Sequence, residues 1–315
     1  MRYPLLFIST IWLLSFLPIN VSGQAPSFEY YQQLNNAETR LPAYKDSDDM
    51  LRLKLQQLER INKSRKKYRV PPVELDILAS RAGNKIALKG SQKKFMGHFN
   101  TKGENPYIRY ALAGGMDHVK ENAASISANQ KLPVGEDDLL DYMKTNHEAF
   151  MAERKPNDGH KQNCIDLHHT HVGLGIGWEN NEFRYYEEFI DRYLEFDLNT
   201  SAVKANQNVS FKFKPLSNHS PYTIIIYHEP FPKPMSPGKI NRIYSYNDYG
   251  KTEILSVPPW ELPKVDAKGW LQFSFTPQKK GYYYVQLFLS AKPYKSGNAT
   301  TEGKIQASGI VVRVD

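Results

Sequence analysis

Residues 172–178 read Val-Gly-Leu-Gly-Ile-Gly-Trp, so an apolar side chain alternates with glycine along the whole stretch. This period of two predicts a buried β-strand, because successive side chains of a strand point to opposite faces of the sheet. The Asn-Asn pair at 180–181 predicts a turn. Phe183, Tyr185 and Phe189 follow it and predict an antiparallel partner strand.

The chain before this hairpin has helical periodicity. Apolar residues recur every three or four positions. The predicted helices cover about 48–69, which ends at a Val-Pro-Pro sequence, about 74–90, which ends at a glycine, and about 136–155, which ends at Pro-Asn-Asp-Gly. Residues 91–135 are expected to be irregular and glycine-rich. Helices followed by strands predict an α+β fold for a first domain of residues 48–195.

The remaining residues, 196–315, predict a second domain made only of strands. Short aromatic and β-branched runs alternate there with Pro, Gly and Asn turns, as in a β-sandwich. The predicted strands are 209–213, 222–227, 270–275, 282–289 and 310–314. The tyrosine-rich run after Gly281 resembles the late strands of immunoglobulin-like modules.

Two further expectations come from aromatic and proline residues of the second domain. Tyr282-Tyr283-Tyr284 and Trp270 could form an exposed platform for sugars, but the alternation of a strand favours a place in the core. Four prolines between 230 and 237 predict a loop between strands.

The N-terminus predicts export. Arg2 precedes an apolar run over 5–17, and small residues then predict signal-peptide cleavage after Gly23 or Ala25. The run is shorter than the roughly 20 apolar residues that a membrane anchor needs. Residues 1–23 are therefore a predicted signal peptide and 24–47 a polar leader. A secreted or periplasmic protein that does not span the membrane is expected.

Composition narrows the classes of function. The net charge of +8 permits an anionic partner, but no arginine-rich helix, zinc-finger spacing or aromatic RNA-binding motif occurs, so nucleic acid is not an expected partner. Cys164 is the only cysteine, so no intrachain disulfide can form. An exported chain without disulfides indicates a bacterial envelope or secreted protein. Cys164 stands in no activating motif and is expected to be a small buried residue.

Four segments of the first domain resemble motifs of one family in their order and spacing. They are Ile-Asn-Lys-Ser-Arg at 61–65 with the exit Val-Pro-Pro-Val at 70–73, Phe-Met-Gly-His-Phe at 95–99 followed by Gly103 and Pro106, Lys-Glu-Asn-Ala at 120–123, and Gly-His-Lys-Gln-Asn at 159–163 followed by Gly-Leu-Gly at 173–175. Together they resemble the CAP superfamily (SCP domain), which comprises cysteine-rich secretory, venom-antigen and pathogenesis-related proteins and their bacterial relatives. The resemblance covers most of residues 58–190 and implies an α-β-α sandwich. This chain lacks the family's cysteines and has Lys161 where arginine is usual.

The resemblance also implies a cleft formed by two histidines and two acids. The matching positions are His98, Glu121 and His160, with Glu153 as the second acid and Glu148 as its alternative. Imidazole and carboxylate groups suit zinc or a similar divalent ion, so zinc is the candidate cofactor, with His98 and His160 as candidate ligands. The same groups could carry out acid–base chemistry or form a buried polar network.

A second group of histidines lies at 168, 169 and 171. His169 and His171 would share one face of a strand, a spacing that can chelate a metal ion. A surface loop that leads into the strand at Val172 is the favoured interpretation.

Three functions follow from these observations. The favoured one is a non-enzymatic exported CAP protein whose His/Glu cleft binds a ligand: a divalent metal ion, a lipid, a glycan or a protein. The second is an envelope adhesion or scaffold protein that acts through the β-sandwich. The third is a hydrolase in which Glu121 or Glu153 acts as base on a metal-bound water.

Overall fold

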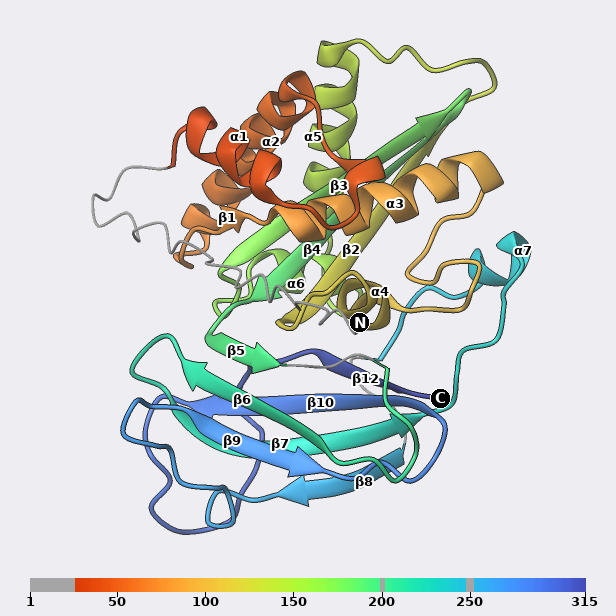
Figure 1. Ribbon diagram of the computed structural model, residues 1–315. Helices are drawn as coiled ribbons and strands as arrows, with labels where there is room; N and C mark the ends of the chain where they lie inside the picture. Colours follow the sequence, from red (N-terminus) through yellow and green to blue (C-terminus); the bar gives the residue numbers. More distant parts are fainter. Residues whose placement is uncertain (1–25, 199–201, 248–251) are drawn as a thin grey trace, which may run out of the picture.

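The computed structural model describes residues 26–198, 202–247 and 252–315. The predicted signal peptide and its cleavage sites lie outside these residues. The helices and strands up to Asp191 pack around one sheet, and the strands from Leu194 onward form two further sheets (Figure 1). We refer to these two parts as the first and the second domain. Among the described residues, no helix combines the length and the apolar character needed to cross a membrane.

The first domain is built on a four-stranded sheet of order β1-β3-β4-β2. Its strands are β1 (Glu74–Leu75), β2 (His118–Ser127), β3 (His171–Glu179) and β4 (Glu182–Asp191). β1 and β3 are parallel, and the other pairs are antiparallel. The hairpin predicted across 180–181 is confirmed, with β3 opposite β4. β2 is an edge strand, so one row of its backbone groups has no neighbouring strand.

Helices cover both faces of this sheet. They are α1 (Phe28–Ala37), η1 (Pro42–Tyr44), α2 (Asp48–Lys67), α3 (Ile77–Lys93), α4 (Pro106–Leu112), α5 (Glu136–Ala152) and α6 (Gly159–Cys164). The glycines of β3 face α3, whose backbone lies directly against them. Val172, Leu174 and Ile176 point the other way, into a core shared with α2 and α5. The mixed α+β character predicted from the sequence is confirmed.

Two regions differ from the sequence expectation. Residues 91–135 contain α4 and β2 rather than irregular chain alone. Charged and amide residues at 120–122 interrupt the apolar alternation of β2, so the sequence pattern did not reveal this strand. An edge strand can carry such polar residues. The polar leader contains α1, whose Tyr31 and Asn35 are buried at 1% exposure against the first domain.

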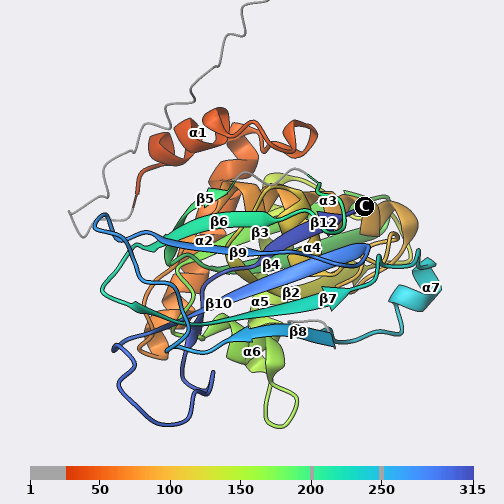
Figure 2. The same ribbon diagram turned by 60° about the horizontal axis from the view of Figure 1, so that its bottom comes forward.

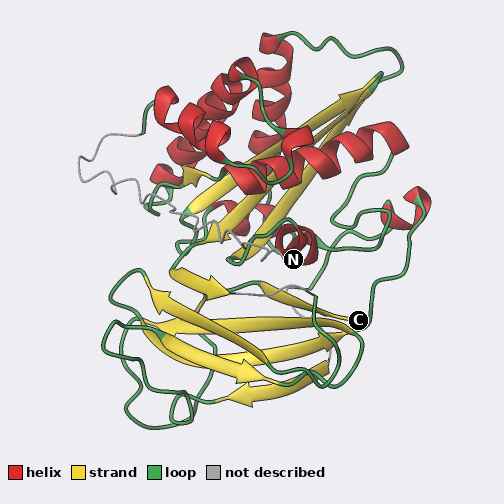
Figure 3. Ribbon diagram, viewed as in Figure 1, coloured by secondary structure: helices red, strands yellow, loops and turns green. Residues whose placement is uncertain are grey.

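The second domain consists of two sheets packed around one core (Figures 2 and 3). One sheet has the order β5-β6-β9, and the other β11-β10-β7-β8 with β12 also paired to β10. The strands are β5 (Leu194–Leu198), β6 (Val209–Pro215), β7 (Ser220–Glu229), β8 (Thr252–Val257), β9 (Leu271–Phe275), β10 (Gly281–Ser290), β11 (Ile305–Gln306) and β12 (Ile310–Val314). All five strands predicted for this domain are present.

The tyrosines of β10 are buried rather than exposed. Tyr283 lies in the core between the sheets. Tyr282 and Tyr284 face the first domain, where Tyr284 stacks on Tyr107 with ring centroids 4.2 Å apart. The Tyr107 hydroxyl donates to Glu229 at 2.6 Å. The core interpretation is confirmed for the three tyrosines, whereas Trp270 is only partly buried. The face of β10 opposite the sandwich core forms the contact between the two domains.

A long connection after β7 returns to the first domain. We call residues 230–247 the strap; it includes α7 (Pro237–Ile240), which Figure 1 shows beside the chain that follows α3. Ile240 is fully buried in a cluster with Phe95 and Tyr186. Met235 N–H donates to the carbonyl of Thr101 at 3.0 Å. The proline-rich loop predicted from the sequence is therefore bound along the first domain.

Candidate functional site

The first half of the expected tetrad lies on the face of β2 that looks toward α3. His98 Nδ1 and Glu121 Oε1 are 2.8 Å apart, and both side chains are buried. Arg109 donates to the other carboxylate oxygen of Glu121 and to the backbone carbonyl of His98. Glu121 is thus held between a histidine and an arginine, and Arg109 is a residue of the site that the sequence motifs did not indicate.

A second buried carboxyl group lies beside Glu121. Glu188 stands directly opposite it on β4 and lies 3.4 Å from Arg109. Burial raises the pKa of Glu188 well above its ordinary value, and the neighbouring Glu121 raises it further, while Arg109 opposes both. Burial also raises the pKa of Glu121, against the effect of Arg109. The two carboxyl groups therefore face one arginine, and burial disfavours a negative charge on both at once.

The other half of the tetrad lies between α5 and α6. His160 Nδ1 and Glu153 Oε1 are 2.5 Å apart. The second oxygen of Glu153 accepts the backbone N–H of His160 at 2.9 Å, at the start of α6. Phe150 stacks on the imidazole with ring centroids 4.8 Å apart. The alternative acid, Glu148, is exposed on α5, so the structure pairs Glu153 with His160.

Both pairs line one cleft of about 690 Å³ at the free edge of β2. A second hollow of about 500 Å³ shares His98, His160 and Tyr244 with it. The strap closes one side of the cleft with Tyr244, Ser245 and Tyr246.

Tyr246 contacts the tetrad directly. Its ring lies 4.7 Å from that of His98, and its hydroxyl accepts the backbone N–H of Glu121 at 2.8 Å. The hydroxyl thereby occupies one backbone donor at the edge of β2. No sequence motif indicated this residue, because it belongs to a loop of the second domain.

The geometry of the histidines bears on metal binding. A histidine that binds a metal commonly donates from its other ring nitrogen to a carboxylate. His98 and His160 each have such a carboxylate at Nδ1. Within the described residues, the group of three donors that approach one another within 4.8 Å is a different one: His147, Cys164 and Glu187.

That buried group is a hydrogen-bonded network beneath the cleft. Glu187 accepts from His147 Nδ1 at 2.8 Å, from the Tyr185 hydroxyl at 2.9 Å and from the Cys164 thiol at 3.3 Å. His147 Nε2 lies 3.0 Å from the Ser64 hydroxyl. Burial raises the pKa of Cys164 well above its ordinary value, and Glu187 adds to this effect. Cys164 is therefore a protonated thiol inside the core.

Cys164 is expected to resist thiol reagents in the folded protein. A buried thiol with a raised pKa offers neither access nor thiolate. Incubation with Ellman's reagent at pH 8 should give no colour from the native chain and one equivalent after guanidinium is added. Rapid reaction of the native chain would show that the network around Cys164 opens readily.

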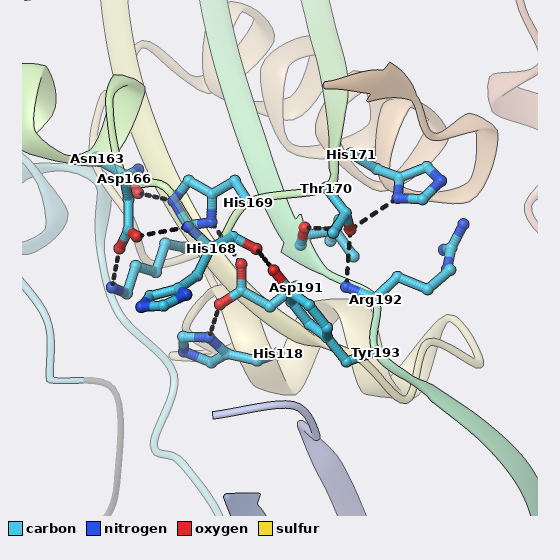
Figure 4. A network of polar contacts seen from close by, with 12 residues as sticks. His118, Asn163, Asp166, His168, His169, Thr170, His171, Asp191, Arg192 and Tyr193 are labelled. Carbon is cyan, nitrogen blue, oxygen red and sulfur yellow. Dashed lines mark hydrogen bonds and ion pairs between the residues drawn. The ribbon is translucent and has the colours of Figure 1, made fainter. Parts of the chain in front are cut away.

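His168 and His169 lie in a loop that leads into β3, as predicted, but His169 is buried rather than at the surface (Figure 4). The Nδ1 atom of His169 lies 2.6 Å from Oδ1 of Asp191. The other carboxylate oxygen of Asp191 lies 2.8 Å from His118 Nδ1. Burial opposes ionisation of Asp191, but the two histidines outweigh it and lower its pKa. His169 Nε2 reaches Asn163 of the cleft at 2.9 Å.

His171 has different surroundings from His169. It begins β3, and its Nδ1 contacts the Thr170 hydroxyl at 2.9 Å. Burial and the nearby Arg192 lower its pKa to about 3, against the effect of Asp76. The two histidines therefore have separate partners and do not act as a chelating pair.

No family model and no curated protein matches the chain. Solved structures do match. An outer surface protein from Borrelia burgdorferi is 17% identical over 45% of this chain and 93% of its own, with a TM-score of 0.35. An extracellular protein containing an SCP domain from Bacillus anthracis is 17% identical over 44% of this chain and 40% of its own, with a TM-score of 0.32. The CAP domain of Enterococcal PrgA is 14% identical over 42% of this chain and 58% of its own, with a TM-score of 0.30.

The chain thus spans less than two thirds of the length of the last two structures. CAP and SCP domain proteins are among the solved structures to which it is similar, as the sequence motifs predicted.

Proposed function

We propose that this chain is an exported CAP-like protein that binds a polar ligand in its His/Glu cleft without turning it over. Zinc or a similar divalent ion is the first ligand to test. The observation that carries the proposal is that two histidine–carboxylate pairs, His98–Glu121 and His160–Glu153, line the same cleft. Export rests on the N-terminal sequence, and the second domain is proposed to be an immunoglobulin-like module.

The contacts of the two acids favour binding over hydrolysis. A general base needs a carboxylate that is available to a water molecule. Glu121 is hydrogen-bonded through one oxygen to His98 and through the other to Arg109, so neither oxygen is free to accept a proton from a water molecule. Glu153 accepts from the ring and the backbone of His160.

The test is a zinc titration by calorimetry on the mature protein. We expect binding in the wild type and its loss in a His98→Ala/His160→Ala variant. Glu153→Gln should weaken binding about tenfold or more, because outer-shell carboxylates orient their histidines. His219→Ala, a partly exposed histidine of the second domain, is the matched control and should bind as the wild type does.

A Cys164→Ser variant separates the cleft from the buried network of His147, Cys164 and Glu187. Unchanged affinity in this variant supports the cleft. Zinc binding that survives the double histidine variant but disappears with Cys164→Ser would refute the metal site at His98 and His160.

Adhesion through the second domain is a second candidate function. It is supported by Trp260, which is 58% exposed and lies 5.4 Å from Tyr294 between ring centroids. Exposed aromatic pairs of this kind suit a glycan or protein surface. Such binding should persist in the His98→Ala/His160→Ala variant and be lost in Trp260→Ala.

A further inference from the structure

The two hollows at the edge of β2 adjoin and form one groove. His98, His160 and Tyr244 line both of them. One hollow includes Lys120, near the start of β2, and the other includes Ser127, at its end. Seven residue steps of an extended strand span about 23 Å. The groove is therefore long enough for a chain-like ligand, with His98 and His160 where the two hollows meet.

Most of the residues that line this groove are polar or charged, and their charges are balanced. Its charged groups are largely paired with one another: Lys120 with Asp166 at 3.1 Å and Arg184 with Glu182 at 2.9 Å. The uncharged polar groups along it are Asn122, Ser125, Ser127, Asn157, Gln162, Asn163, Asn241 and Ser245. Pockets for apolar ligands have mostly apolar walls. Amide and hydroxyl side chains at this density suit a neutral ligand rich in hydroxyl groups.

The strap adds an exposed aromatic ring where the two hollows meet. Tyr244 is 86% exposed, although its neighbours fix its position: Ile240 is fully buried and Tyr246 is bonded to β2. An exposed ring beside polar groups can pack against the apolar face of a sugar while amides bind its hydroxyls.

The free edge of β2 is less suited to a peptide. A peptide commonly binds an edge strand by adding another strand, which needs the backbone donors of that edge. The Tyr246 hydroxyl already accepts the N–H of Glu121, near the Lys120 end of the groove. This contact obstructs strand addition at that end and leaves side-chain recognition of a saccharide unaffected.

We propose that this groove binds an extended neutral oligosaccharide, with Tyr244 of the second domain as its stacking platform. The proposal rests on the proposed function in one respect, namely that the His/Glu cleft is a ligand site. It adds the class of ligand and assigns part of the site to the second domain.

The test is calorimetric titration of the full mature chain with cellohexaose, chitohexaose and xylohexaose. We expect one or more of these to bind, and Tyr244→Ala to weaken the binding about tenfold, as loss of a stacked ring does. Because Tyr244 is 86% exposed, its removal should leave the thermal unfolding midpoint unchanged. Trp260→Ala tests the alternative surface on the second domain. Tyr68→Ala, at an exposed tyrosine that lines neither hollow, is the matched control and should bind normally.

Three outcomes would overturn the proposal: no binding of any hexasaccharide, binding unaffected by Tyr244→Ala, or binding lost only in Trp260→Ala. Zinc titration of the same samples separates this proposal from the preceding one. If histidine-dependent zinc binding persists without saccharide binding, only the ligand class proposed here fails. If Tyr244-dependent saccharide binding occurs without zinc binding, only the proposal that the cleft binds a metal ion is refuted.

Discussion

Replacement of Gly175 by alanine is expected to lower the free energy of unfolding of the first domain by about 3 kcal/mol or more. A Cβ atom at this position would lie 2.3 Å from the carbonyl carbon of Gly83 and 2.4 Å from its Cα. Both neighbours are backbone atoms of α3, so no side chain can rotate away. The helix would have to move off the sheet, and its other contacts with Gly173 and Gly177 would loosen with it.

The measurement is urea unfolding followed by circular dichroism at 222 nm. This signal reports the first domain, because the described helices other than α7 belong to it or to the leader packed against it. Gly159→Ala is the matched control: its Cβ would meet nothing within 4 Å, and the change should stay within about 1 kcal/mol. Equal unfolding midpoints for the two variants would mean that α3 adapts to the added methyl group.

Replacement of Arg109 by methionine is expected to cost about 3–5 kcal/mol of stability, the usual effect of removing one partner from a buried ion pair. Arg109 is the cation beside Glu121 and Glu188, and its side chain is 8% exposed. Without it, the charge shared by two buried carboxyl groups has no arginine to offset it. Urea unfolding of Arg109→Met against the wild type measures the effect. Adding Glu121→Gln to this variant should restore part of the loss, because the uncompensated charge is then removed.

Glu188→Gln is the matched control for this prediction. Since the raised pKa keeps Glu188 protonated, an amide replaces a neutral group of nearly the same shape. The folded state holds a proton that the unfolded state releases above the ordinary pKa of 4.5, so wild-type stability should fall as the pH rises through that value. As the pH rises above about 4.5, Glu188→Gln should therefore lose less stability than the wild type. Parallel pH profiles would show that Glu188 is ionised in the native protein.

The sequence predicted those parts of the fold and the site that depend on local patterns. The alternation of glycine and apolar residues over 172–178 was sufficient for β3, and the motifs around His98 and His160 were sufficient to place both histidines at one cleft. Glu153 was one of two acids that the resemblance implied, and it is the one that forms a hydrogen bond with His160 in the structure.

Contacts between distant segments of the chain could not be predicted from the sequence. β2 has polar residues at its centre, so no period of two revealed it, and the place of Glu188 opposite Glu121 depends on the pairing of β2 with β4. Arg109 and Tyr246 carry no motif at all. Tyr246 is 125 residues from its partner Glu121, and only the docking of the second domain brings them together.

The strap has a consequence for how such a chain can be recombined. An exchange of second domains at residues 192–194 would appear to cut between two independent modules. It would, however, remove Ile240 from the cluster around Phe95 and leave an apolar cavity on the surface of the first domain. It would also remove the wall that holds the ring of His98. The unit that can be inherited with its cleft intact is therefore the pair of domains, and viable chimeras should carry the strap together with its own first domain.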